Sequence, residues 1–300
     1  MTRFRIPPFQ IPFFLCAFVS LWQALPARAQ GAVGRVAVDY RPPTLLVEAR
    51  INGHGPMWFA FDTGASTCLI DFKVAQRLGL KPTQRPGREG PYFTRARRLA
   101  VGRAEARDLE LVIRDLSPVS KRVGREVAGI VGYTWMEQFV FEIDYRTGQL
   151  TIWPRTVELT PRADQLPVPL EIHSIRGFTG ATPYVPAQLN NRHRCRMLLD
   201  TGTDLSILGR QMALELGVDV NALGGTGERP RYNVRRLDLG GRVFGNVPFF
   251  VEPRRGADGN PYAQCIVGNE VLKEFVLTID IARRRAFFRK QSPVPSGDTQ

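Results

Sequence analysis

Short stretches in which apolar and polar residues alternate recur along the chain, and they predict β-strands. Residues 35–40 and 45–51 alternate in this way, and Asn52-Gly53 is then typical of a two-residue hairpin turn. The next apolar stretch, residues 57–59, leads toward Asp62. The pattern therefore predicts a hairpin whose second strand runs into an aspartate.

A short helix is expected after these strands. Asp71 is placed to cap its first turn, and Gly79 is placed to end it, because glycine readily adopts the left-handed conformation found at helix ends. Residues 209–217 repeat this pattern later in the chain. The apolar face of the first helix consists of Val74, Ala75 and Leu78.

Each half of the chain is predicted to end in a further hairpin. Residues 139–153 reverse at residues 146–148, and residues 275–288 reverse near residues 282–284. The stretch 154–169 contains four prolines and is the natural connection between the halves. The pattern thus predicts an all-β protein made of two similar halves.

The two halves carry the same motif. Residues 61–66 read Phe-Asp-Thr-Gly-Ala-Ser, and residues 199–204 read Leu-Asp-Thr-Gly-Thr-Asp. The first aspartate of each motif, Asp62 and Asp200, lie 138 residues apart (200 − 62). Self-similarity at a fixed offset indicates a long internal duplication.

A second motif follows each aspartate at a matched distance. Ile-Val-Gly ends at Gly132 in the first half and at Gly268 in the second, 136 residues apart (268 − 132), so the second half is two residues shorter. Two apolar-Asp-Thr-Gly loops, each paired with an apolar-apolar-Gly segment, resemble the aspartic peptidases of the pepsin and retropepsin type. The resemblance covers about residues 35–290. Within the family, the chain resembles the bilobal single-chain form, as in bacterial retropepsin-like aspartyl proteases.

The resemblance implies an all-β fold of two acid-protease lobes related by a pseudo-twofold axis, each with a short helix. The active-site cleft would then lie between the lobes. The domain boundaries that follow are a signal peptide 1–29, an N-terminal lobe 30–156, a linker 157–169, a C-terminal lobe 170–291 and a disordered tail 292–300.

Two facing carboxyls can hydrolyse a peptide bond without a metal ion, a cofactor or a covalent intermediate. Held close together, they cannot both ionise and therefore share one proton, which leaves one as general base and the other as general acid. The resemblance implies that Asp62 and Asp200 form this catalytic dyad. We therefore expect no cofactor.

The resemblance also assigns supporting roles to the residues around the dyad. In the family the two threonines, here Thr63 and Thr201, hydrogen-bond across the lobe interface and hold the loops rigid. The glycines leave room for the backbone and the substrate to approach. A hydroxyl at the position of Ser66 can bond the outer oxygen of an aspartate. The remaining loop-support residues are Gly64, Gly132, Gly202 and Gly268.

Substrate contacts are expected at three further residues. Asp204 resembles an acid of the retroviral enzymes that meets the substrate backbone, so it is expected to bind substrate. Residues 84–98 and 224–236 are polar and rich in glycine and arginine, and they are placed to form flaps over the cleft before strands resume. Tyr92 and Tyr232 are the flap aromatics expected to line the cleft, although loop aromatics often pack on the core instead.

The first residues are typical of an export signal. Arg3 and Arg5 precede an apolar run over residues 11–25, and Ala27-Arg28-Ala29 places small residues where a signal peptidase reads them. We expect cleavage after Ala29 and a periplasmic or secreted protein. An uncleaved membrane anchor is the alternative, but the run is short for a membrane span.

The net charge of +13 raises the question of partners. The arginines are scattered and no aromatic-basic motif is present, which argues against nucleic-acid binding. A solvated basic surface that can contact anionic membranes is expected instead.

The three histidines form no zinc-binding pattern, so no metal site is expected. Because the duplication supplies both aspartates, we expect a monomer that acts on peptides or proteins.

Three cysteines remain if Cys16 leaves with the signal, so at most one disulfide can form. Cys195 and Cys265 would lie on neighbouring strands if the family fold holds, and a bridge between them is conceivable. Buried free thiols are the expected state, because cysteine behaves as a small apolar residue. Cys68 completes the set.

The function that the motifs indicate is that of an aspartic endopeptidase. The alternative from another class is a peptide-binding module that kept the fold and lost turnover, although no motif residue is missing. A third interpretation is a basic scaffold associated with the cell envelope. Peptide cleavage by the purified protein separates the first interpretation from the other two.

Overall fold

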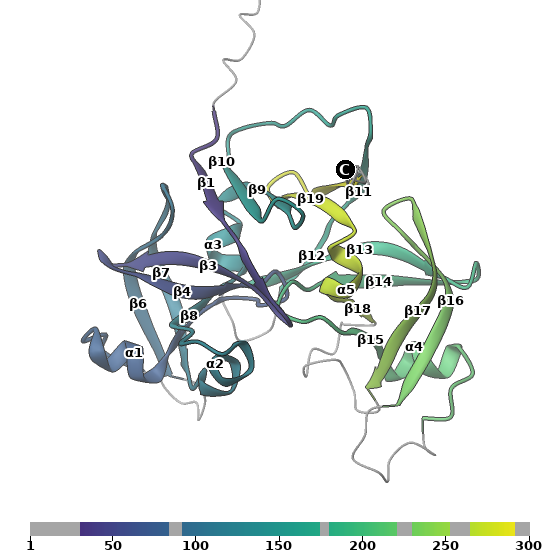
Figure 1. Cartoon of the computed structure of the whole chain (residues 1–300), viewed down its shortest axis with the longest axis horizontal. Helices are drawn as coiled ribbons and strands as arrows, with labels where there is room; N and C mark the ends of the chain where they lie inside the picture. Colours follow the sequence, from purple (N-terminus) through teal and green to yellow (C-terminus); the bar gives the residue numbers. More distant parts are fainter. Residues whose placement is uncertain (1–30, 84–91, 175–179, 221–229, 253–264, 292–300) are drawn as a thin grey trace, which may run out of the picture. The chain divides into compact units, whose positions relative to one another are not determined.

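The alternating stretches form three β-sheets in the computed structural model (Figure 1). Two sheets have seven strands in the same order of equivalent strands, and the third has six. The prediction of an all-β protein with two similar lobes is confirmed. The structure describes residues 31–83, 92–174, 180–220, 230–252 and 265–291.

The first lobe is built on a closed barrel. Its strand order is β2-β3-β4-β8-β5-β7-β6, and an additional pairing of β3 with β6 closes six of these strands on themselves. Closure removes the exposed sheet edges, and the inward side chains fill the interior. The elements are β2 (Asp39–Arg41), β3 (Thr44–Ile51), β4 (His54–Phe61), β5 (Cys68–Asp71), α1 (Phe72–Arg77), β6 (Tyr92–Val101), β7 (Ala104–Arg114), α2 (Ser117–Val123), β8 (Gly129–Val131) and α3 (Tyr133–Met136).

The second lobe repeats this barrel in the strand order β12-β13-β14-β18-β15-β17-β16, closed by the pairing of β13 with β16. Figure 1 shows its hairpins in green. The elements are β12 (Glu171–Ser174), β13 (Ala181–Leu189), β14 (His193–Leu199), β15 (Ser206–Gly209), α4 (Arg210–Glu215), β16 (Arg231–Leu239), β17 (Arg242–Glu252), β18 (Cys265–Val267) and α5 (Asn269–Leu272).

The third sheet takes strands from both halves of the chain, in the order β1-β10-β9-β19-β20-β11. At its centre Glu142 faces Thr278, residues that are 136 apart (278 − 142), and the Thr278 hydroxyl donates to the Glu142 carboxylate at 3.0 Å. The pairing is symmetric about this point, as expected for a pseudo-twofold axis. The strands are β1 (Gly34–Ala37), β9 (Phe139–Asp144), β10 (Gln149–Pro154), β11 (Gln165–Pro169), β19 (Phe275–Asp280) and β20 (Arg285–Lys290).

Helix α1 has the ends that its sequence predicts. One carboxylate oxygen of Asp71 accepts hydrogen bonds from the backbone N–H groups of Lys73 at 2.9 Å and Val74 at 3.2 Å. These donors have no partner within the helix, so the cap stabilises its first turn. Gly79 has φ +65°, the left-handed conformation expected after a helix end.

Strands β6 and β16 begin earlier than predicted, at Tyr92 and Arg231 rather than after the polar stretches. In β6, Phe93 and Ala96 are buried whereas Arg95 and Arg97 are exposed. The arginines occupy the solvent-facing positions of a barrel strand, which explains why the stretch resembled a loop. Residues 84–91 of the first predicted flap and residues 224–229 of the second lie outside the described residues.

The end of the predicted linker is also a strand. Gln165–Pro169 forms β11 and pairs with β20 at the edge of the six-stranded sheet. An edge strand tolerates Pro167 and Pro169, since a missing N–H on the open side costs no hydrogen bond. The predicted signal peptide and the predicted C-terminal tail lie outside the described part of the chain.

Cys68, Cys195 and Cys265 are buried free thiols, as expected. Burial raises the pKa of Cys265 well above its ordinary value, and a hydrogen bond with Cys195 raises it further. Within the portion of the chain that the structure describes, no helix has the length and apolarity to cross a membrane.

Candidate active site

Each Asp-Thr-Gly loop begins at the end of a strand that pairs with an Ile-Val-Gly strand. Phe61 of β4 lies opposite Val131 of β8, and the N–H of Asp62 donates to the Val131 carbonyl at 3.0 Å. In the second lobe the N–H of Asp200 donates to the Val267 carbonyl at 3.1 Å. The paired strands therefore position both aspartates in the same way.

The glycines that end the paired strands lie directly under the loops. A methyl group added at Gly132 would lie 2.3 Å from the Thr67 carbonyl oxygen, and one at Gly268 would lie 2.6 Å from the backbone of Asp204. Only glycine permits this approach, so a side chain at either position would push the strand away from the loop.

The two loops are joined by reciprocal hydrogen bonds of their threonines. The backbone N–H of Thr63 donates to the Thr201 hydroxyl at 3.0 Å, and the N–H of Thr201 donates to the Thr63 hydroxyl at 3.1 Å. The hydroxyls in turn donate to the carbonyls of Leu199 at 2.6 Å and Phe61 at 2.7 Å. Both threonines are buried, so these four bonds fix the loops of the two lobes against each other.

The glycine of each motif packs against the aspartate of the other. A methyl group added at Gly64 would lie 2.5 Å from Cγ of Asp200, and one at Gly202 would lie 2.4 Å from Cγ of Asp62. The N–H of Gly64 also donates to Oδ1 of Asp62 at 2.8 Å, so its backbone contacts one carboxyl and nearly touches the other. Each carboxyl therefore lies against the glycine of the opposite loop.

Backbone donors orient both carboxyls. Oδ1 of Asp62 accepts from the N–H groups of Gly64 at 2.8 Å and Ala65 at 3.0 Å, and Oδ1 of Asp200 accepts from Gly202 at 2.8 Å. Asp62 is half-buried and Asp200 is buried. Carboxyls fixed by their own loops and screened from bulk water interact more strongly than exposed ones.

Asp204 of the second loop contacts the first half of the chain. The hydroxyl of Tyr40 in β2 donates a short hydrogen bond to Oδ1 of Asp204. Burial raises the pKa of Tyr40 above its ordinary value, and the negative charge of Asp204 raises it further, so the phenol stays a donor. The predicted substrate contact of Asp204 remains a prediction.

Asn269, which follows Gly268, extends this contact between the lobes. Its side-chain amide donates to the backbone carbonyls of Pro43 at 2.8 Å and Thr201 at 3.0 Å, and its side-chain oxygen accepts from the Tyr145 hydroxyl at 2.6 Å. Burial raises the pKa of Tyr145 well above its ordinary value, with contributions from nearby groups that include Asp200. Asn269 and Tyr145 hold the second loop, and the motif search did not find them.

The first loop has different neighbours. A methyl group added at Gly180, just before β13, would lie 1.5 Å from the Ser66 carbonyl oxygen, so the second half of the chain packs directly on this loop. The Thr134 hydroxyl accepts from the N–H of Cys68 at 3.2 Å. The hydrogen bond predicted from Ser66 to an aspartate remains a prediction.

The two predicted flap tyrosines lie in strands. Tyr92 is the first residue of β6 and is 52% exposed, directly after the undescribed residues 84–91. Tyr232 packs against the core, and its hydroxyl accepts from the side chain of Asn190 at 3.5 Å. The backbone of Tyr232 pairs with Phe249 of β17, which in turn pairs with Ser206, two residues after Asp204. That Tyr232 lines the cleft remains a prediction.

Among the described residues, no group of three or more histidine, cysteine, aspartate or glutamate side chains is arranged to hold a metal ion.

Comparison with known families agrees with this geometry. The family model described as aspartyl protease matches the chain twice, over residues 47–135 and 185–271. The matches start 138 residues apart (185 − 47) and end 136 apart (271 − 135), which are the offsets of the duplicated motifs. Together they cover more than half of the chain, which therefore belongs to the aspartyl protease family in its two-repeat, retropepsin-like form. No curated protein matches the chain.

Proposed function

We propose that the protein is an aspartic endopeptidase in which Asp62 and Asp200 activate a water molecule. The observation that carries this proposal is the reciprocal packing of each aspartate against the glycine of the opposite loop. With each carboxyl against the opposite loop, the two carboxyls are proposed to share one proton, so that one carboxylate and one carboxylic acid face the same water.

Hydrolysis follows from this protonation state. The carboxylate takes a proton from the water as its oxygen attacks the peptide carbonyl carbon, while the carboxylic acid gives its proton to the carbonyl oxygen. The tetrahedral intermediate then collapses and the C–N bond breaks. The leaving nitrogen takes up the proton of the dyad, while one hydroxyl of the intermediate gives its proton to the other carboxylate as the new carboxylic acid forms. The dyad ends with one shared proton, as it began.

The surrounding contacts keep the carboxyls in position during these transfers. The threonine bonds between the loops and the backbone donors to Oδ1 of Asp62 and Asp200 all come from the protein itself. A site that is already ordered loses little free energy to rearrangement during the reaction.

Asp204 is proposed to bind the substrate backbone. Tyr40 donates to Oδ1 of Asp204, and this contact orients the carboxylate. Its second oxygen can then accept a hydrogen bond from a substrate N–H. Tyr92 is exposed and directly follows residues 84–91 in the chain, and it is proposed as a flap residue.

The cellular setting is also part of the proposal. The N-terminal signal supports export to the periplasm or the medium, and the single-chain supply of both aspartates supports a monomer. Peptides or proteins in that compartment are the proposed substrates.

Cleavage of a peptide library by the purified protein tests the proposal. We expect hydrolysis at acidic pH and its inhibition by a statine-containing peptide, which mimics the tetrahedral intermediate. Mass spectrometry of the products identifies the cleaved bonds. Tight binding of library peptides without any cleavage would replace the proposal by the peptide-binding module.

A further inference from the structure

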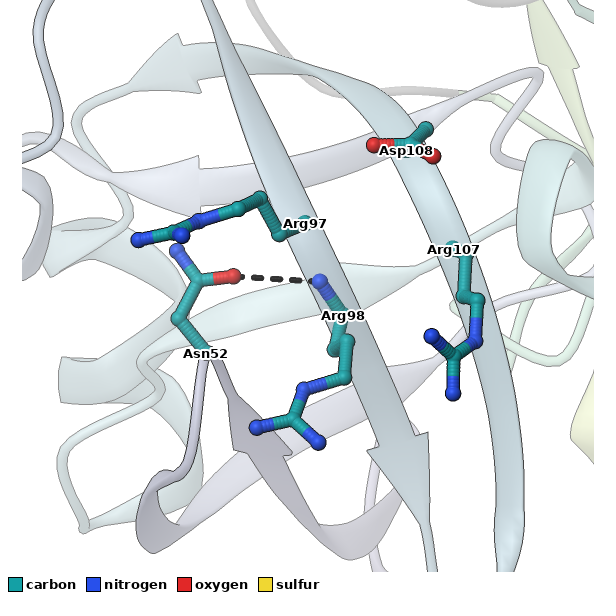
Figure 2. A pocket seen from close by; sticks show the side chains of 5 residues that line it. All are labelled: Asn52, Arg97, Arg98, Arg107 and Asp108. Atoms are coloured by element: carbon teal, nitrogen blue, oxygen red, sulfur yellow. Dashed lines mark hydrogen bonds between the residues drawn. The ribbon is translucent and has the colours of Figure 1, made fainter.

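Two pockets outside the catalytic loops lie at equivalent positions of the two lobes. The first has a volume of about 400 Å³ and is lined by Asn52, Arg97, Arg98, Arg107 and Asp108 (Figure 2). The second has a volume of about 370 Å³ and is lined by Asn190, Asn191, Arg192, His193, Arg235 and Arg236. The asparagine and the arginine pair recur at the offset of 138 residues (190 − 52, 235 − 97, 236 − 98).

The same backbone frame builds both pockets. The side-chain oxygen of Asn52 accepts from the N–H of Arg98 at 3.1 Å, and that of Asn190 accepts from the N–H of Arg236 at 3.1 Å. Both asparagines adopt the left-handed conformation, with φ 51° and 50°, at the turn of a hairpin. Each turn is therefore fixed against the arginine-bearing strand, which makes the pockets rigid.

The first pocket brings like charges together. Arg98 of β6 and Arg107 of β7 are directly opposite in the sheet register, and Figure 2 shows both side chains extending to the same side. Like charges at such a pair destabilise a sheet. Glu105 offsets part of this repulsion, at 2.8 Å from Arg107 and 3.9 Å from Arg98.

The second pocket is more strongly basic. Its lining contains three arginines and a histidine and no acidic residue, and position 243, equivalent to Glu105, is valine. The Nε of Arg236 is buried and has no hydrogen-bond partner within the described part of the chain. A buried donor without an acceptor is costly, and this cost adds to the repulsion among the arginines of the pocket.

We propose that each lobe has a binding site for a phosphate group on this Asn-Arg-Arg frame. Guanidinium groups bind phosphate through paired, charge-assisted hydrogen bonds, and several arginines around one cavity match an anion with several acceptor oxygens. The second-lobe site, which lacks a competing carboxylate in its lining, binds more tightly. Each asparagine precedes its catalytic-loop aspartate by ten residues, so the sites are separate from the dyad.

The phosphate can be free or carried by an anionic lipid headgroup. The sites can be read separately by NMR, because the side-chain amides of Asn52 and Asn190 report on one pocket each. We expect saturable shifts of both signals when inorganic phosphate replaces chloride at constant ionic strength. Arg98→Gln should weaken binding at the first site and Arg236→Gln at the second, each by about tenfold, as the loss of one charge-assisted hydrogen bond implies.

Matched variants separate a built site from general attraction to the basic surface. Arg122 and Lys290 are exposed and lie outside both pockets, so Arg122→Gln with Lys290→Gln removes the same charge as Arg98→Gln with Arg236→Gln. We call the double variant Arg98→Gln with Arg236→Gln the pocket pair. Only the pocket pair should lose the saturable NMR shifts. Equal weakening by both pairs, or shifts that never saturate, would overturn the proposal.

Vesicles identify the source of the phosphate. If the headgroup is the ligand, the protein should sediment with phosphatidylglycerol vesicles and not with phosphatidylcholine vesicles, and the pocket pair should abolish this. Binding of inorganic phosphate without vesicle binding assigns free phosphate. Peptide hydrolysis, measured in parallel, should be unchanged in the pocket pair, so failure of this proposal is distinct from failure of the proposed enzyme.

Discussion

At the scale of single residues, Gly64 and Gly202 occupy positions at which any larger side chain would collide with an aspartate of the opposite loop. Gly64→Ala should lower kcat by about 100-fold or more, because the methyl group would meet the Asp200 carboxyl at 2.5 Å and displace it by roughly 1 Å. The measurement is steady-state cleavage of a peptide identified from the library.

Gly245→Ala is the matched control for this substitution. Gly245 lies in β17, and the nearest atom to an added methyl group is a carbonyl oxygen at 3.9 Å, so the variant should keep wild-type turnover. If Gly64→Ala were as active as Gly245→Ala, the close packing of the loops would not matter for catalysis.

The contact of Tyr40 with Asp204 is a second single-residue feature with a measurable consequence. Tyr40→Phe removes the hydrogen bond to the carboxylate and should lower the free energy of unfolding by about 1–3 kcal/mol. Urea denaturation measures this loss. In a double-mutant cycle with Asp204→Asn, the two losses should be less than additive, and full additivity would show that the residues do not interact.

At the scale of elements, the two Asp-Thr-Gly loops are held together by buried hydroxyls. Thr63→Val keeps the shape of the side chain but leaves the Thr201 N–H and the Leu199 carbonyl without this partner. We expect the free energy of unfolding to fall by about 1–3 kcal/mol and activity to fall with it.

Thr63→Ser retains the hydroxyl and should behave much more like the wild type in both thermal unfolding and turnover. The comparison isolates the hydrogen bonds from the packing of the γ-methyl group. Equal stability of the valine and serine variants would contradict a role for the hydroxyl in joining the loops.

Some elements could be predicted from the sequence because their causes are local. Asp71 and Gly79 set the ends of α1 whatever lies around it, and Asn52-Gly53 sets its hairpin. Strand β11 depends on a partner that is distant in sequence, since its residues pair with β20 from Arg285 onward. Its two prolines therefore indicated a linker until the pairing was known.

The same distinction applies to the candidate site. Asp62 and Asp200 could be found because the duplication repeats them with their neighbours. Asn269 replaces the tyrosine at the equivalent position 133 and binds Pro43 from the other half, so no repeat could indicate it. The start of β16 was misplaced because arginines on the exposed face of the strand gave it the composition of a loop.

At the scale of the whole molecule, several raised pKa values make stability sensitive to alkali. Burial is the main cause at Tyr40, Tyr145 and Cys265, whose ordinary pKa values are 10.0, 10.0 and 9.0. The unfolded chain releases these protons at lower pH than the folded protein, so it binds fewer protons above those values. The contribution of these three groups to the free energy of unfolding is therefore present below about pH 9 and is lost as the pH rises toward their folded pKa values.

Urea denaturation from about pH 8 to about pH 11 measures this effect. Each proton held only by the folded protein contributes a slope of about 1.4 kcal/mol per pH unit. Tyr40→Phe should make the decline shallower, because one such proton is removed. A free energy of unfolding that stayed constant or rose over this range would contradict the expected direction.

The proposed function requires both halves of the duplicated chain to supply one catalytic dyad. Asp62→Asn and Asp200→Asn each keep the size of the side chain, and each should abolish peptide hydrolysis because the remaining carboxyl cannot be both base and acid. Asp164→Asn, at an exposed position outside the loops, is the control that should retain full activity.

The most direct measurement is the turnover of these three variants and the wild type on one peptide, from acidic to neutral pH. We expect the wild type and Asp164→Asn to be active in acid and to lose activity as both dyad carboxyls ionise, and Asp62→Asn and Asp200→Asn to remain folded and inactive at every pH. Wild-type turnover in either of these two variants would contradict the dyad.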